Sequence, residues 1–221
     1  MSLCFLNSVF FIGLQPSKKG FVLKRPIIFS SLPTNIRMKK ITYLLLALTV
    51  LFVACNDDDD RVAEITLNHD GENVTAPNLP ADIYEAAAQF TIAETTPFIG
   101  QNLSEVTYYM YDAPLSTRLI IYGGDGNQPG EVLYEQSLTG TITPNEWNSH
   151  VLSTPIEITG GGLWISLQLR HDGTQQSIGC DAGPTDGGGD WLFQDSDNVW
   201  RAFRQRTGES INWNIRGILT E

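Results

Sequence analysis

The chain has 221 residues, and its 25 acidic residues outnumber its 14 lysines and arginines, which gives a formal net charge of −11. All of the acids follow residue 54, where the basic side chains are seven arginines and no lysine occurs. A surface this acidic repels nucleic acid and anionic membranes, so we exclude polynucleotide binding and expect neutral sugars, calcium or a basic partner instead.

A secretion signal is predicted near the N-terminus. Lys39 and Lys40 give it a positive start, and the apolar run at residues 41–52 is shorter than the ~20 residues that a membrane-spanning helix needs. We therefore predict that residues 38–54 form a cleaved signal peptide, with a transmembrane anchor as the alternative. Because this signal is complete by itself, we expect that translation starts after residues 1–37, which are then not made.

The end of the signal resembles the lipobox of bacterial lipoproteins, on the residues FVAC at 52–55. In that family the cysteine is lipidated and becomes the first residue of the mature protein. The resemblance therefore implies a lipid anchor on Cys55 that attaches the protein to a membrane, with a plain secretory signal as the alternative. Residues 56–60, NDDDD, carry too much charge to pack into a core, so we predict a tether in water over residues 55–63.

An acidic run directly after the lipidated cysteine is also similar to the export tag on surface lipoproteins of glycan-scavenging Gram-negative bacteria. This resemblance implies a lipid-anchored protein of the outer membrane that faces the cell exterior. A hydrophilic spacer without a role in export is the alternative interpretation. With Cys4 untranslated and Cys55 lipidated, Cys180 remains alone, so no disulfide framework is expected.

Beyond the tether, apolar and polar residues alternate along many short segments. Such alternation is typical of strands that have one face in the core. Because no long segment has helical periodicity, we predict one all-β domain over residues 64–221, a β-sandwich. The predicted strands lie at residues 64–68, 106–111, 118–122, 132–136, 147–152, 163–169 and 212–219.

Glycine marks two of the predicted turns, at residues 123–130 and 159–162. Residues 83–88, IYEAAA, are predicted as a short helix, or as the approach to a strand at 88–92. A further turn is expected near residues 95–99. Helical structure is therefore expected to be short and peripheral to the sheets.

Five segments in a fixed order resemble a jelly-roll module of secreted bacterial proteins. The module is similar to β-sandwich domains appended to secreted peptidases and to adhesin regions of gingipain-type proteases. The resemblance implies a jelly-roll-like antiparallel β-sandwich that serves as an extracellular binding or accessory domain, and we expect it to stand alone behind the lipid anchor. The five segments are residues 86–114, 119–136, 146–171, 178–193 and 212–221.

Aspartates gather in two loop segments that are candidates for a cation site. Asp181, Asp186 and Asp190 share a glycine-rich loop, and Asp70 lies in a second acidic turn. Carboxylates and backbone carbonyls on a flexible loop suit calcium, so we hypothesise a structural calcium ion. The alternative is a pair of solvated loops whose aspartates cap turns. No other cofactor is expected.

Five tryptophans lie between residues 147 and 213. Trp191 and Trp200 border the acidic loop, and aromatic rings beside carboxylates are typical of lectin-like sugar sites. Trp164 alternates with polar residues opposite an aliphatic face, which predicts an exposed or interfacial ring. Trp213 shares a side with Ile215 and is predicted to lie inside. Trp164, Trp191 and Trp200 are the candidate ligand-binding residues, with core packing as the alternative.

The sequence contains no G-x-S-x-G elbow, no H-E-x-x-H motif and no P-loop, and Cys180 is predicted to be a buried thiol. We therefore expect a protein that is not an enzyme. The first hypothesis is a surface-exposed glycan-binding or adhesin-type module. The alternative is a protein-interaction or structural accessory subunit of an outer-membrane assembly, with an apolar patch around Tyr109, Tyr111 and Trp164. A hydrolase ranks third.

Overall fold

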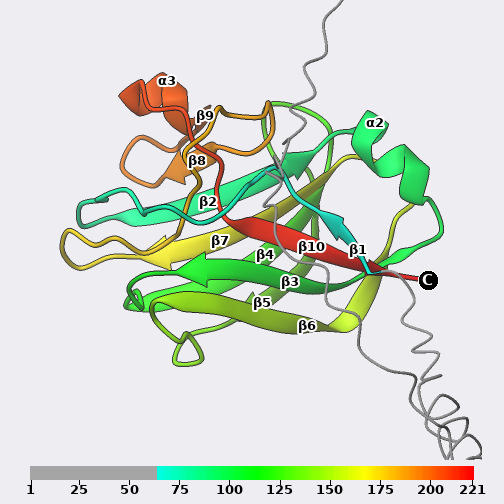
Figure 1. Ribbon diagram of the computed structural model, residues 1–221, viewed down its shortest axis with the longest axis horizontal. Coiled ribbons are helices and arrows are strands. Elements are labelled where there is room, and N and C mark those ends of the chain that lie inside the picture. Colours follow the sequence, from blue (N-terminus) through cyan, green and yellow to red (C-terminus); the bar gives the residue numbers. More distant parts are fainter. Residues whose placement is uncertain (1–63) are drawn as a thin grey trace, which may run out of the picture. The chain divides into compact units, whose positions relative to one another are not determined.

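The computed structural model describes residues 64–221 (Figure 1). These residues form two antiparallel sheets that pack face to face as a sandwich, so the predicted fold class is confirmed. The smaller sheet has the strand order β1 (Ile65–Leu67), β10 (Ile215–Thr220), β3 (Asn102–Met110) and β6 (Glu146–Glu157). The larger sheet has the order β5 (Val132–Ser137), β4 (Ser116–Gly123), β7 (Leu163–Arg170), β2 (Ile83–Phe90), β8 (Trp191–Gln194) and β9 (Val199–Ala202).

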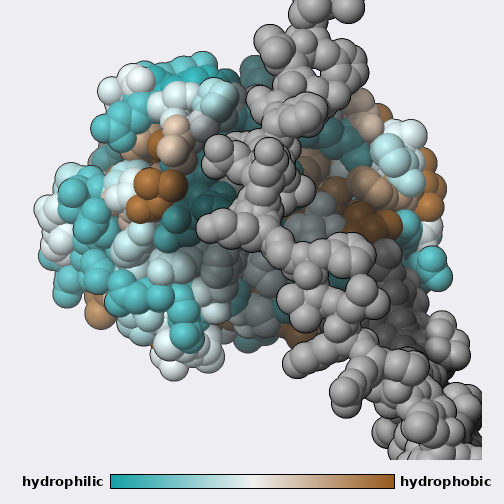
Figure 2. Space-filling model, in the orientation of Figure 1, coloured by the Kyte–Doolittle hydropathy of each residue, from teal (hydrophilic) through white to brown (hydrophobic). Residues whose placement is uncertain are grey.

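The predictions for the signal peptide, for Cys55 and for the tether up to residue 63 lie outside the described residues. The described residues belong to one compact unit, Asp60–Glu221. Between residues 64 and 221, no helix has both the length and the apolar character that crossing a membrane requires. On the face drawn in Figure 2, hydrophilic residues cover most of the visible surface of this unit and hydrophobic residues appear in small groups.

The core lies between the sheets and is built by alternation along the strands. In β7 of the larger sheet, the four aliphatic side chains at odd positions are at most 3% exposed. In β3 of the smaller sheet, Leu103, Tyr108 and Met110 are buried in the same core. Trp213, which precedes β10, is fully buried and packs edge-on against Phe203, with ring centroids 5.2 Å apart. The prediction that Trp213 lies inside is therefore confirmed.

The helix predicted at residues 83–88 is wrong, because this segment forms the greater part of strand β2. β2 pairs with β7 on one side and with β8 on the other. Alanine favours helices only weakly, and burial of this strand between two neighbours outweighs that preference. Tyr84 and Phe90 face the core, whereas Glu85 and Gln89 face outward, as a period of two requires.

Three short helical turns complete the unit. α2 (Ile92–Thr95) and η1 (Thr96–Phe98) follow β2, and η1 confirms the short helical turn predicted near residues 95–99. Thr91 and Glu94 form a capping box at the start of α2, in which the Glu94 carboxylate accepts the Thr91 amide at 2.7 Å. α3 (Phe203–Thr207) follows β9 directly.

Both predicted glycine turns are present, and they touch each other. Gly124, in the connection from β4 to β5, has a φ of +118°, which favours glycine. Its amide donates to the carbonyl of Gly162, in the connection from β6 to β7, at 2.9 Å. A Cβ atom on Gly162 would collide with the Gly124 carbonyl, so the close approach of the two turns requires glycine there.

Candidate functional site

Four aromatic side chains meet on the outer face of the larger sheet, the face that points away from the core. The Trp164 ring centroid lies 5.1 Å from that of Trp191 and 5.5 Å from that of Trp200. Phe193 extends the group, with its centroid 5.6 Å from Trp200. These four residues are called the tryptophan cluster below. The cluster joins all three candidate ligand-binding residues, which come from β7, β8 and β9.

The strand register explains why these rings meet. β2 lies between β7 and β8, and Ala87 of β2 pairs with Ser166 on one side and with Trp191 on the other. Because alanine has no side chain beyond Cβ, the Trp164 and Trp191 rings can approach each other across β2. Trp200 is placed by its pairing with Phe193 in the β8–β9 hairpin.

The cluster has a buried floor and a partly exposed rim. Trp164 is fully buried, so the prediction of an exposed or interfacial ring is wrong, although the predicted face is correct. The ring is buried because Trp191 and Trp200 pack on it. Trp191, Phe193 and Trp200 are each partly exposed. Trp191 and Trp200 therefore present ring surface to solvent on this face, and Trp164 supports them from below.

A buried carboxyl group lies beside the cluster. Glu85 is 4% exposed and stands opposite Phe193 in the sheet. Its Oε1 atom accepts the hydroxyl groups of Ser166 at 2.6 Å and of Tyr122 at 2.8 Å. Burial raises the pKa of Glu85, although these two hydrogen bonds act in the opposite direction. Gln168 lies next to Glu85 in the register, and its side chain is partly exposed.

The loop that leads into Trp191 is fixed to β2 by a histidine. His69 donates from Nε2 to the carbonyl of Gln89 at 2.6 Å and stacks on Phe90, with ring centroids 4.7 Å apart. Its Nδ1 atom lies 3.3 Å from the Asp186 carboxylate. The backbone amide of Gln89 donates to the backbone carbonyl of Gly188 at 2.9 Å. Asp186 therefore serves as a contact that holds the loop in place.

Asp181, a predicted calcium ligand, is occupied by protein donors. Its Oδ1 atom accepts the amides of Gly183 and Asn212 at 2.8 and 2.7 Å. Its Oδ2 atom accepts the Gly71 amide at 3.0 Å and the Asn212 side chain at 2.9 Å. Burial opposes the charged form, but the four hydrogen bonds outweigh burial and lower the pKa of Asp181. The carboxylate ties three loop segments together.

The other buried aspartates also have partners. Asp70 accepts Nε of Arg216 at 3.0 Å and the Asn214 amide group at 2.6 Å, and Asp190 accepts the backbone amide of Arg204 at 3.0 Å and its guanidinium at 2.6 Å. Among residues 64–221, no three His, Cys, Asp or Glu side chains are arranged to hold a metal ion. The structure thus does not assemble the hypothesised calcium site of Asp70, Asp181, Asp186 and Asp190.

A second aromatic group lies on the smaller sheet. The Tyr109 ring centroid is 5.1 Å from Tyr111 and 5.8 Å from Trp147, and the Arg216 guanidinium lies 4.2 Å from the centre of the Trp147 ring. The patch predicted around Tyr109 and Tyr111 therefore contains Trp147. Trp164, assigned to the same patch from the sequence, belongs to the other sheet, because alternation alone does not show which sheet a strand joins.

Two groups with nucleophilic potential are buried. Cys180 is fully buried, as predicted, and burial raises the pKa of its thiol to about 12. The Ser177 hydroxyl lies 2.8 Å from Nε2 of His171, and no sequence pattern predicts this pair. Because Ser177 is fully buried and His171 is 4% exposed, a substrate does not reach this pair.

No protein-family model and no curated protein matches this chain. Among solved structures, the fold is similar to part of a clostridial cysteine protease, Cwp84, after propeptide cleavage, with a TM-score of 0.51 and 10% sequence identity. The match covers 71% of this chain and 40% of the protease, and at this identity it shows the fold alone. A structure of infectious bursal disease virus, Gx strain, aligns with a TM-score of 0.22 and 12% identity over 71% of this chain and 30% of that chain. A TM-score this low does not indicate a shared fold.

Proposed function

We propose that this protein is a non-catalytic surface lipoprotein whose sandwich domain binds extracellular glycans at the tryptophan cluster. The observation that carries the proposal is the convergence of Trp164, Trp191 and Trp200 from three strands onto one face. The lipid anchor on Cys55 and the location at the outer face of the outer membrane are part of the same proposal, and they rest on the lipobox resemblance and the acidic run.

The chemistry of the cluster supports a sugar ligand. The electron-rich face of an indole ring attracts the slightly positive C–H face of a pyranose ring, and such sites add a small number of polar groups that fix orientation. Trp191 and Trp200 are partly exposed and supply the ring faces. Gln168 supplies amide hydrogen bonds, and Asp195 in the exposed β8–β9 turn supplies a carboxylate. Glu85 orders Tyr122 and Ser166 under the site.

A non-catalytic function is consistent with the accessible chemistry. Glu85 has a raised pKa, as acid catalysts often do, but it is buried and its Oε1 atom already accepts two hydroxyl groups. A glycosidase needs a second carboxyl group across a cleft, about 5 to 10 Å away. We therefore assign Glu85 a structural role beneath the cluster.

A glycan array tests the proposal. Residues 56–221, purified without lipid, are expected to bind a restricted set of glycans, and the W191A/W200A double variant is expected to lose that binding while it keeps its fold by circular dichroism. Trp147→Ala is the matched control, because it removes an indole that is 38% exposed on the other sheet. No selective binding, or equal binding by the double variant, would contradict the proposal.

The second candidate function is protein interaction on the smaller sheet. It is favoured by the exposure of Trp147 and by Val151, which is 67% exposed on the same strand, β6. In the array experiment it corresponds to a negative result for glycans. In a pull-down with the intact lipoprotein from membranes, partner binding would then be lost in Trp147→Ala and kept in the W191A/W200A variant.

A further inference from the structure

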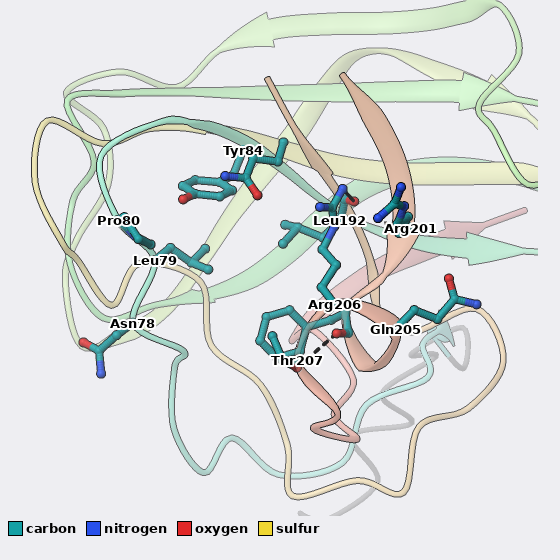
Figure 3. Close-up of a pocket in the computed structure, with 11 residues that line it drawn as sticks. Asn78, Leu79, Pro80, Tyr84, Leu192, Arg201, Gln205, Arg206 and Thr207 are labelled. Atoms are coloured by element: carbon teal, nitrogen blue, oxygen red, sulfur yellow. Dashed lines mark hydrogen bonds between the residues drawn. The ribbon is translucent and has the colours of Figure 1, made fainter. Parts of the chain in front are cut away.

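A pocket of about 440 Å³ lies behind the β8–β9 hairpin, on the side opposite the tryptophan cluster (Figure 3). Figure 3 shows Asn78, Leu79 and Pro80 along one side of it, Arg201 and Gln205 along the other, and Leu192 between them. Its size is near the lower end of the range for small-molecule sites, roughly 300–1,000 Å³. Its volume matches that of a ligand of the size of one sugar ring.

The pocket follows from the unequal size of the two sheets. β8 and β9 form one edge of the larger sheet, beyond β2 and β7, against which β10 of the smaller sheet packs. At this edge α3 and the segment before β2 cover the inner face in place of the smaller sheet. Strand alternation then divides the hairpin: Trp200 points outward, and the next residue, Arg201, points to the pocket side with its pairing partner Leu192.

The described residues that line this pocket include two arginines and no acid, in a chain that is strongly acidic elsewhere. Arg206 is held in place, because its guanidinium donates to the Asp197 carboxylate at 2.7 Å and to the carbonyl of Val199 at 2.5 Å. Asp197 therefore offsets part of the charge of Arg206. Arg201 is exposed and lines one side of the pocket, so its guanidinium is free to contact a ligand there.

The remaining lining combines amides with an apolar floor. Asn78, Gln194 and Gln205 offer side-chain amides, whereas Leu192 and Phe203 form an apolar floor. Gln194 donates its Nε2 group to Asp82 at 2.9 Å, which orients its carbonyl oxygen as an acceptor. This combination suits a compact ring with several hydroxyl groups and one negative charge, because guanidinium groups bind carboxylates in a bidentate manner.

We propose that this pocket binds a sugar acid, a single pyranose ring that carries a carboxylate, with Arg201 as the residue that contacts the carboxylate. The inference goes beyond the glycan site proposed above and does not depend on it. A second depression of about 420 Å³ shares Asn78, Phe203 and Thr207 with the pocket, but Glu209 lines it. The carboxylate is therefore placed in the first pocket, beside the two arginines.

Calorimetric titration of the full chain at neutral pH and low salt, with glucuronate and with glucose, tests this assignment. Glucuronate is expected to bind at least about tenfold more tightly than glucose, because a hydrogen bond to a charged group is roughly twice as strong as one between neutral groups. Arg201→Gln is expected to lower the affinity for glucuronate by about tenfold or more. Arg170→Gln, which removes the same charge from an exposed position that does not line the pocket, is expected to have no effect.

The inference would be overturned by no measurable glucuronate binding, by equal affinity for glucose and glucuronate, or by equal losses in Arg201→Gln and Arg170→Gln. The W191A/W200A variant separates the two sites. It is expected to keep glucuronate binding, since neither indole lines the pocket. If it loses glucuronate binding as fully as Arg201→Gln does, the sugar acid is bound at the tryptophan cluster and the pocket assignment fails.

Discussion

At the scale of single residues, Glu85 is a buried carboxyl group, and burial disfavours its ionised form. It is 4% exposed, and its Oε1 atom orders the hydroxyl groups of Tyr122 and Ser166 below the tryptophan cluster. Either protonation state allows that oxygen to accept hydrogen bonds. The residue therefore contributes geometry through its oxygen atom, and its charge is a burden at neutral pH.

Replacing Glu85 by glutamine is expected to stabilise the protein at neutral pH. Because the pKa of Glu85 is higher in the folded state than in the unfolded state, protonated Glu85 favours folding. The free energy of unfolding therefore falls as pH rises from the unfolded-state pKa through the folded-state pKa and Glu85 ionises. Glutamine keeps an acceptor oxygen and never ionises. We expect Glu85→Gln to gain about 1 kcal/mol in unfolding free energy at pH 8, or ~2–4 °C in Tm.

Thermal melts across pH check this expectation. The gain is expected to shrink toward zero below about pH 4, where both states of the wild-type carboxyl group are protonated. Tyr122→Phe serves as a control, because it removes one donor to Glu85 without removing the acid. A lower Tm for Glu85→Gln than for the wild type at pH 8, with no difference below about pH 4, would show that the ionised carboxylate stabilises the fold.

At the scale of elements, the alternation of residues predicted the long strands but did not identify all of them. β7 has eight residues with aliphatic side chains on one face, which alternation reveals. β8 and β9 have four residues each, too few for a period to emerge, and the sequence analysis missed both. Residues 83–88 are predicted as a helix, or as the approach to a strand at 88–92, because three alanines favour a helix locally, and the position of β2 between two strands overrides that preference.

The candidate site was predictable in composition but not in arrangement. The tryptophans are visible in the sequence, whereas their contact depends on Ala87 of β2 lying between β7 and β8, a pairing across more than 70 residues. The candidate calcium ligands lie apart for a related reason. Asp181 and Asp190 find their donors, Asn212 and Arg204, later in the chain, and no local pattern shows such partners.

The loop before β8 depends on His69, and its removal is expected to loosen that loop locally. His69→Ala removes the hydrogen bond to the Gln89 carbonyl and the contact with Asp186, at a cost of about 1–3 kcal/mol, because the buried Gln89 carbonyl loses its side-chain donor. Amides of residues 186–190 are expected to exchange hydrogen faster than in the wild type, since the Gly188 region rests on β2.

Hydrogen exchange read by mass spectrometry gives the answer segment by segment. The control is His150→Ala, which removes a contact of 2.9 Å between Nε2 of His150 in β6 and the Tyr134 hydroxyl in β5. Both strands are edge strands, far from the loop before β8 in the strand order. That variant is expected to affect residues 132–137 instead. Unchanged exchange at residues 186–190 in His69→Ala would mean that the backbone contacts alone hold the loop.

At the scale of the whole molecule, the sandwich places two aromatic surfaces on its two outer faces. The tryptophan cluster lies on the larger sheet, and Trp147 with Tyr109 lies on the smaller one. Buried aspartates with protein donors then join the connecting loops to the sheets. Internal hydrogen bonds therefore hold these loops, and the folded domain needs no calcium ion to connect them.

Calcium removal is consequently expected to leave global stability unchanged. A bound ion would raise Tm in proportion to the logarithm of its concentration over its Kd, whereas carboxylates already satisfied by amides and guanidinium groups gain nothing from it. Melts with excess EDTA and with excess calcium are expected to agree within about 1 °C. A Tm several degrees lower in EDTA would mean that a calcium ion stabilises the folded chain.

The partly exposed rings of the tryptophan cluster are proposed to hold the ligand, and the indole N–H signals of the five tryptophans test this directly by NMR. Titration with a glycan selected on the array is expected to shift the Trp191 and Trp200 signals progressively and to leave the Trp147 signal, on the other sheet, in place. Shifts confined to Trp147, or no shift in any indole while binding is detected by another method, would contradict the account.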